Sequence, residues 1–186
     1  MQTVERDFIA RYLSDSERRL LALTDHLTPR QQSFRPSPQA WSITDIFEHL
    51  AIIEGNSLRR MEERLQEPAE TERQSRPDLD AVILNVVPAR TGRPQTPESV
   101  RPTGRWPSFG DTLDQFRQAR ALSLHLAQTT QADVRAYLLP HAFLGDLDIY
   151  QWLLFFGAHA ERHRKQAQEI KDGRRFPASG GLARRG

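Results

Sequence analysis

Apolar residues recur at intervals of three and four along four long stretches of the chain, and this spacing is typical of amphipathic helices. The stretches run from about residue 4 to 27, from 43 to 67, from 109 to 129, and from a cap at Asp146 or Asp148 to residue 171. Residues 82–87 show the same spacing over a shorter distance. No alternating pattern is long enough to predict a strand, so the sequence predicts an all-α fold.

Helix caps and one proline-rich segment indicate how the predicted helices are connected. Ser42 with Asp45, and Ser108 with Asp111, have the spacing of an approximate capping box at a helix start. The segment 88–107 contains five prolines, and a loop this long is uncommon in a compact domain unless it is functional or disordered. Four helices with one long crossover loop predict a four-helix bundle.

The length of 186 residues fits one domain that can bury its own core. We place the helical bundle domain at residues 1–173. Residues 174–186 are rich in glycine and arginine and offer few side chains that could pack. This tail is therefore predicted to be disordered.

The composition excludes several kinds of chemistry. The chain has no cysteine, so disulfides, cysteine-bound metals and a protein thiol nucleophile are excluded. Its 26 basic and 24 acidic residues are spread along the same helices, and without a basic cluster we expect no nucleic-acid partner. The longest apolar stretch, residues 152–158, is far shorter than a membrane span. With no signal-peptide pattern at the N-terminus, the expected location is the cytoplasm.

Three histidines are candidates for a metal site. His159 and His163 are four residues apart in the last predicted helix, so both side chains project from one face. His49 lies on another helix, beside apolar residues that face the core. Three imidazoles would leave a coordination position open for water or substrate, which is typical of a catalytic site. The spacing alone leaves a second interpretation open, in which these are structural histidines hydrogen-bonded within a bundle.

Other polar residues near these histidines are candidates for supporting roles. Asp45 lies one turn before His49 and is a candidate fourth ligand or hydrogen-bond acceptor, although an N-cap role explains it equally well. His141, Arg162 and Gln166 are candidate substrate contacts. Glu48 and Glu161 flank histidines in the sequence, but we expect both side chains to point away into solvent. The three tryptophans are expected to be core or loop anchors.

Two segments resemble the DinB-like superfamily, in particular its DinB_2 type. The first is Trp41-Ser42-Ile43-Thr44-Asp45-Ile46-Phe47-Glu48-His49-Leu50, which is similar to the family pattern W-S-x-x-E/D-x-x-x-H-L. The second begins at His141 and continues through Trp152 to His159-Ala160-Glu161-Arg162-His163-Arg164-Lys165-Gln166. It departs from the family pattern only mildly, with Ala142 where proline is frequent. The intervening Pro102-Thr103-Gly104 also resembles the family's middle loop.

The resemblance implies a four-helix bundle that holds one divalent metal ion, zinc, nickel or iron, through His49, His159 and His163. In family members similar to bacillithiol transferases and mycothiol-dependent maleylpyruvate isomerase, the metal activates a low-molecular-weight thiol. The first functional hypothesis is therefore a metal-dependent thiol (S-) transferase with a detoxification role. A metal-dependent hydrolase and a non-enzymatic metal- or ligand-binding stress protein are the alternatives. The resemblance also implies pairing into a homodimer.

Overall fold

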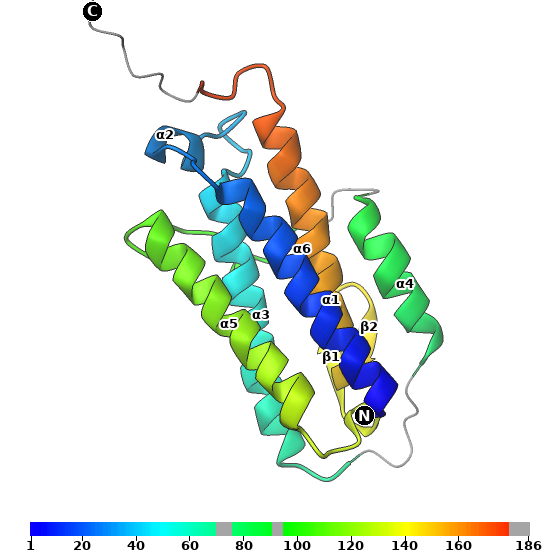
Figure 1. Ribbon diagram of the computed structural model, residues 1–186. Coiled ribbons are helices and arrows are strands. Elements are labelled where there is room, and N and C mark those ends of the chain that lie inside the picture. Colours follow the sequence, from blue (N-terminus) through cyan, green and yellow to red (C-terminus); the bar gives the residue numbers. More distant parts are fainter. Residues whose placement is uncertain (70–75, 91–94, 179–186) are drawn as a thin grey trace, which may run out of the picture.

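The computed structural model describes residues 1–69, 76–90 and 95–178, and its core is a bundle of four long helices (Figure 1). Helix α1 packs against α5 and α6, and α3 packs against the same two helices from the other side. The predicted all-α four-helix bundle is therefore confirmed. The four helices are α1 (Thr3–Leu21), α3 (Ile43–Leu65), α5 (Phe109–Thr129) and α6 (Ile149–Lys171).

The connection between α3 and α5 spans the length of the bundle. Figure 1 shows α3 and α5 running in the same direction, so the chain must return along the bundle before α5 can begin. It returns through the short helix α4 (Asp78–Val86), which packs against α6. The 3₁₀ turns η2 (Val87–Ala89) and η3 (Glu98–Val100) lie in the predicted crossover loop.

The capping predictions are confirmed, whereas the connections contain elements that the sequence did not indicate. Ser42 and Ser108 each accept a hydrogen bond from the backbone three residues later, and Asp148 caps α6. The first helix is shorter than predicted, because η1 (Ala22–Thr24) and the one-turn helix α2 (Pro29–Gln32) follow it. A further 3₁₀ turn, η4 (Val134–Ala136), precedes α6.

A two-stranded antiparallel hairpin corrects the prediction that the chain has no strands. Strand β1 (Leu138–His141) pairs with β2 (Gly145–Asp148) in a register that places Leu139 opposite Leu147. Each strand has only four residues, which is too short for an alternating pattern to be recognised. Gly145 has a φ of +75°, which suits glycine at the turn.

A buried ion pair lies at the centre of the bundle. The Arg120 guanidinium on α5 donates to both carboxylate oxygens of Glu54 on α3, at 2.9 and 3.0 Å. It also donates to the Leu13 carbonyl and the Ser16 hydroxyl of α1, each at 2.8 Å, and to the Phe156 carbonyl of α6 at 3.4 Å. The Arg120 side chain is fully buried. One arginine therefore links all four helices.

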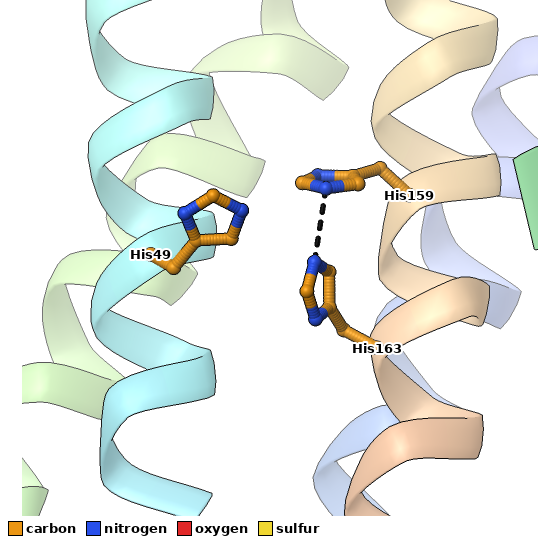
Figure 2. Close-up of side chains that lie close together, drawn as sticks. All are labelled: His49, His159 and His163. Carbon is orange, nitrogen blue, oxygen red and sulfur yellow. Dashed lines mark hydrogen bonds between the residues drawn. The ribbon is translucent and has the colours of Figure 1, made fainter. Parts of the chain in front are cut away.

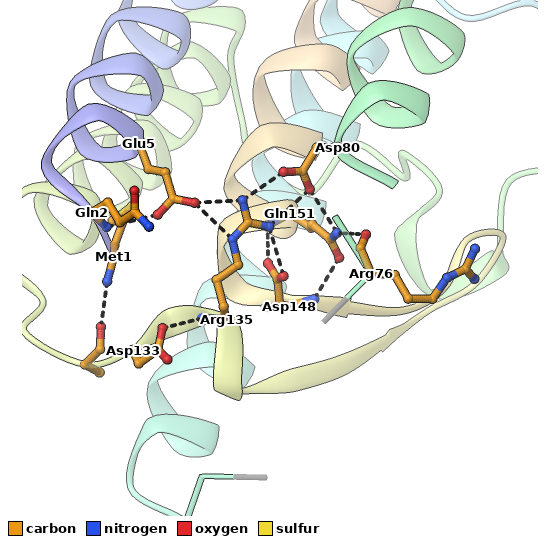
Figure 3. Close-up of polar contacts among 10 residues, drawn as sticks. Met1, Gln2, Glu5, Arg76, Asp80, Asp133, Arg135, Asp148 and Gln151 are labelled. Atoms are coloured by element: carbon orange, nitrogen blue, oxygen red, sulfur yellow. Dashed lines mark hydrogen bonds and ion pairs between the residues drawn. The ribbon is translucent and has the colours of Figure 1, made fainter. Parts of the chain in front are cut away.

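A second arginine ties α4 to the end of the bundle (Figure 3). The Arg135 guanidinium donates to Glu5 of α1 and to Asp80 of α4, each at 2.8 Å, and to Asp148 at 3.2 Å. Its guanidinium carbon lies 4.1 Å from the ring centre of Tyr150, within cation–π range. These contacts hold α4 beside α6, where the end of α4 and the following turn form one wall of the cavity described below.

The first residues of the predicted disordered tail are packed. Phe176 contacts the core, and its ring meets Phe34 edge to face with centres 5.7 Å apart. Gln31 of α2 donates to the Pro177 carbonyl at 2.8 Å. The chain thus stays packed through residue 177, four residues past the predicted boundary at residue 173, while residues 179–186 lie outside the described part of the chain. Of the helices described, none is both long and apolar enough to cross a membrane.

A glycine in α6 allows close packing against α1. A Cβ added at Gly157 would lie 2.5 Å from two ring carbons of Tyr12, so Gly157→Ala is expected to lower the free energy of unfolding by about 1–3 kcal/mol. Nothing lies within 4 Å of a Cβ added at Gly55 in α3. Gly55→Ala should therefore raise stability by about 0.5–1 kcal/mol. Urea unfolding tests both, and equal stabilisation by the two substitutions would contradict the steric argument.

Candidate metal centre

Two helices bring the three predicted histidines together. His49 extends from α3, and His159 and His163 extend from α6 one turn apart (Figure 2). All three side chains are buried, with at most 9% of each residue exposed. Each contributes one ring nitrogen to a group in which the nitrogens lie within 4.8 Å of one another. We call these three residues the histidine cluster.

Hydrogen bonds at the far edges of two rings determine which nitrogens face the centre of the cluster. The Nδ1 of His49 lies 2.8 Å from the Val100 carbonyl, and the Nδ1 of His163 lies 2.9 Å from Oε1 of Gln166. A carbonyl oxygen can only accept, so each Nδ1 carries the proton. In a neutral imidazole the Nε2 is then left with a free electron pair.

The distance within the cluster fits a shared cation. The Nε2 atoms of His159 and His163 are 3.0 Å apart (Figure 2). Two free electron pairs at this distance would repel, so a proton or a metal ion must lie between them. Two imidazoles that bind one tetrahedral ion at 2.0–2.1 Å have their nitrogens about 3.3 Å apart, a few tenths of an ångström more than this distance. The residues present therefore fit a metal ion, and Gln166 and the Val100 carbonyl would orient two of the three histidines that hold it.

Burial keeps the cluster neutral and ready to bind a cation. Desolvation lowers the pKa of His49 to about 4, against a smaller opposing effect of its hydrogen bond to Val100. Desolvation also lowers the pKa values of His159 and His163 well below the ordinary value, and the neighbouring imidazoles add to this effect. A neutral imidazole is the form that binds metals.

The histidine cluster lies in the wall of a cavity of about 1020 Å³. The ring centre of Trp41 lies 4.7 Å from that of His49, and the ring of Phe155 stacks on His159 at 4.9 Å. Aromatic side chains therefore shield the cluster on two sides. Arg60, Arg90 and Arg162 also line the cavity.

Comparison with known proteins gives the family. The sequence pattern of the DinB superfamily matches residues 12–167, which is most of the chain. This protein belongs to the DinB superfamily. It is 27% identical to the uncharacterized protein YuaE of Bacillus subtilis over 149 residues, which cover 78% of this chain and 86% of YuaE.

Solved structures show the same fold in other proteins. YfiT from Bacillus subtilis, described as a probable metal-dependent hydrolase with an unusual four-helix bundle topology, superposes with a TM-score of 0.62. The match covers 92% of this chain and 88% of YfiT at 14% identity. TT2238, described as a four-helix bundle protein, superposes with a TM-score of 0.54 at 21% identity, covering 88% of this chain and 98% of TT2238. Both confirm the bundle predicted for a DinB protein.

The predicted supporting residues lie in different places in this DinB domain. Gln166 contacts the cluster directly, through His163. His141 and Arg162 line the cavity. His141 accepts hydrogen bonds at Nδ1 from the backbone of Phe143 and Leu144, each at 3.2 Å, which leaves its proton on Nε2.

Asp45 is not a ligand in this structure. One of its oxygens accepts from the Ser42 backbone at 2.6 Å and from the Ser42 hydroxyl at 2.7 Å, and the other accepts from Arg35 at 2.7 Å. It also lies outside the group of residues whose ligand atoms converge. The N-cap interpretation therefore accounts for Asp45.

Two predictions for residues around the site were wrong. Glu48 is buried, with 1% exposed, and it accepts hydrogen bonds from the crossover loop instead of facing solvent. Glu161 is partly buried and pairs with Arg164 at 2.7 Å and with Arg19 at 3.4 Å.

Arg90 lines the cavity but was not predicted as a site residue, because a residue in a loop carries no periodic signal. It donates to Gln166 at 3.2 Å and pairs with Glu169 at 2.9 Å.

Proposed function

We propose that this DinB protein is a metal-dependent enzyme that acts on small molecules, and that thiol (S-) transfer is its reaction. The observation that carries the proposal is the convergence of three buried, neutral imidazoles at one wall of a large cavity, with no carboxylate among the converging groups of the described residues. Three protein ligands with a position left for substrate are typical of catalytic sites, whereas structural sites use four.

The chain's own residues would bind and orient the substrate. A divalent ion at the cluster would lower the pKa of a bound thiol or water molecule. Trp41 and Phe155 exclude water from the adjoining rings. His141 presents an Nε2–H group that can donate a hydrogen bond, and desolvation lowers its pKa to about 4, so it stays a neutral donor near pH 7.

The charge of the cavity favours an anionic substrate. Three arginines line it, against one carboxylate, Glu169, among the described lining residues. Burial lowers the pKa of Arg162, and the positive charge of Arg90 lowers it further against an opposing effect of Glu169. A low-molecular-weight thiol that carries a carboxylate matches both the cluster and the charge of the cavity. Because the chain has no cysteine, the reacting thiol would come from the substrate.

Hydrolysis of an ester or amide is the second candidate reaction. It is supported by the likeness to YfiT, which is described as a probable metal-dependent hydrolase. The same three imidazoles would serve it, with water taking the place of the thiol.

The test compares the two reactions on one preparation. Protein incubated with zinc, nickel or iron is given a thiol, cysteine or glutathione, together with an electrophilic aromatic chloride, and separately a panel of nitrophenyl esters. The thiol-transfer proposal expects conjugation above the uncatalysed rate that His49→Ala abolishes and His125→Ala, on an exposed part of α5, retains. Ester release with the same dependence on His49 would favour the hydrolase. If the protein binds metal but shows no turnover in either assay, both enzyme proposals fail and a non-enzymatic binding protein is the remaining interpretation.

A further inference from the structure

A buried carboxylate next to His49 holds the crossover loop. The Glu48 carboxylate accepts hydrogen bonds from three consecutive backbone N–H groups: Thr103 at 2.7 Å, Gly104 at 2.9 Å and Arg105 at 3.2 Å. Successive N–H groups that converge on one point form an anion-binding nest. Gly104 has a φ of +77°, a backbone conformation that suits glycine in such a turn.

The same loop segment also binds the adjacent histidine. Val100, three residues before Thr103, offers its carbonyl to the Nδ1–H of His49 at 2.8 Å. Glu48 and His49 are neighbours on α3, and they bind the two ends of the segment 100–105. The Glu48 carboxylate therefore fixes the position of the loop that carries the acceptor for His49.

The acceptor matters because it selects one form of the ring. When Nδ1–H of His49 donates a hydrogen bond to the Val100 carbonyl, the Nε2 atom of the same ring has a free electron pair that faces His159 and His163. If the loop moved away, Nδ1 would lose its buried partner. The ring would then be free to rotate or to carry its proton on Nε2, where it blocks metal binding.

We propose that Glu48 is a positioning residue, which acts through residues 100–105 to hold His49 in the Nδ1–H form that binds a metal ion. The metal part of this inference rests on the proposed function, whereas the ring orientation does not. A purely structural Glu48 would anchor the loop without affecting the form of His49, and the experiment distinguishes these roles.

The first measurement needs no metal. Proton–nitrogen NMR of the imidazoles in metal-free protein is expected to show His49 as a single Nδ1–H tautomer in the wild type. In Glu48→Ala, and in Gly104→Val, which disturbs the nest without touching Glu48, we expect a mixture of tautomers. Glu48→Gln keeps a carbonyl oxygen that can accept from the loop and should stay close to wild type. Ser123→Ala is the matched control, because it removes a buried hydrogen bond to Glu54 away from the loop.

The second measurement is zinc affinity by competition with a chelator, supported by the visible spectrum of the cobalt-loaded protein. Loss of an outer partner of a ligand typically lowers metal affinity about 10- to 100-fold, and we expect this for Glu48→Ala. Glu48→Gln should lose less than Glu48→Ala, while Ser123→Ala should keep the affinity and spectrum of the wild type.

The inference would be overturned if Glu48→Ala kept the wild-type tautomer populations at His49. It would also be overturned if Glu48→Ala lost no more zinc affinity than Ser123→Ala does. If the wild type binds neither zinc nor cobalt, the proposed function fails, and the NMR result still decides the role of Glu48.

Discussion

Replacing His163 by alanine is expected to abolish metal binding, and His49→Ala should do the same. Wild-type protein incubated with zinc, nickel or iron should retain about one ion per chain, because the three imidazoles converge on one point. Each substitution leaves only two of the three ligands. We expect the variants to retain less than roughly a tenth of the wild-type metal content, because metal sites need their full ligand set. Elemental mass spectrometry measures this directly.

The control for this experiment is His125→Ala. His125 is exposed on α5 and is not among the converging ligands, so its loss should leave the metal content unchanged. Stability gives a second measure: zinc at 100 times its Kd should raise the free energy of unfolding of the wild type by about 2.7 kcal/mol, and that of His163→Ala by much less. A wild type that stays metal-free with all three metals would make the cluster structural and would remove both enzyme proposals together.

The second large effect is expected at the ion pair in the centre of the bundle. Glu54→Leu leaves the fully buried Arg120 guanidinium without its counter-charge. Breaking a buried pair in this way typically costs about 3–5 kcal/mol, so we expect the free energy of unfolding to fall by that amount. Urea unfolding followed by circular dichroism measures the change.

The double variant Glu54→Leu/Arg120→Met separates charge burial from packing. Removing both charges leaves no stranded ion, so most of the lost stability should return. Glu62→Leu, an exposed position on the same helix, should change stability by no more than about 0.5 kcal/mol. If the double variant were as unstable as Glu54→Leu, the loss would arise from packing and not from the unpaired arginine.

Helical periodicity predicted the bundle and made the three histidines candidates for one site, whereas the family resemblance was needed to favour a metal site over structural histidines. His159 and His163 are one turn apart on a buried stripe, and His49 lies on a helix with a similar stripe, so their meeting follows from the bundle itself. Glu48 could not be predicted in the same way. Adjacent residues on a helix point in different directions, and the side of α3 that Glu48 faces is covered by a loop whose path has no periodic signal.

The hairpin and the buried ion pair were missed for related reasons. The hairpin has strands of four residues, too few to show a period of two. Glu54 and Arg120 have the residue types of a solvated helix face, and only the three-dimensional packing shows that they are buried together. Charged residues are rarely fully buried unless paired, so a sequence pattern assigns them to the surface by default.

The crossover loop has consequences for how the lining of the cavity can change among such bundles. The three histidines lie on the helices α3 and α6, whereas Thr96, Pro97, Ser99 and Val100 of the loop form part of the cavity wall. Among the described residues of the loop, only 100 and 103–105 form hydrogen bonds with Glu48 and His49. Loops tolerate insertions and replacements better than the helices they connect. Descendants of this chain could therefore exchange the part of the loop before residue 100, and with it part of the cavity wall, while inheriting the same three histidines.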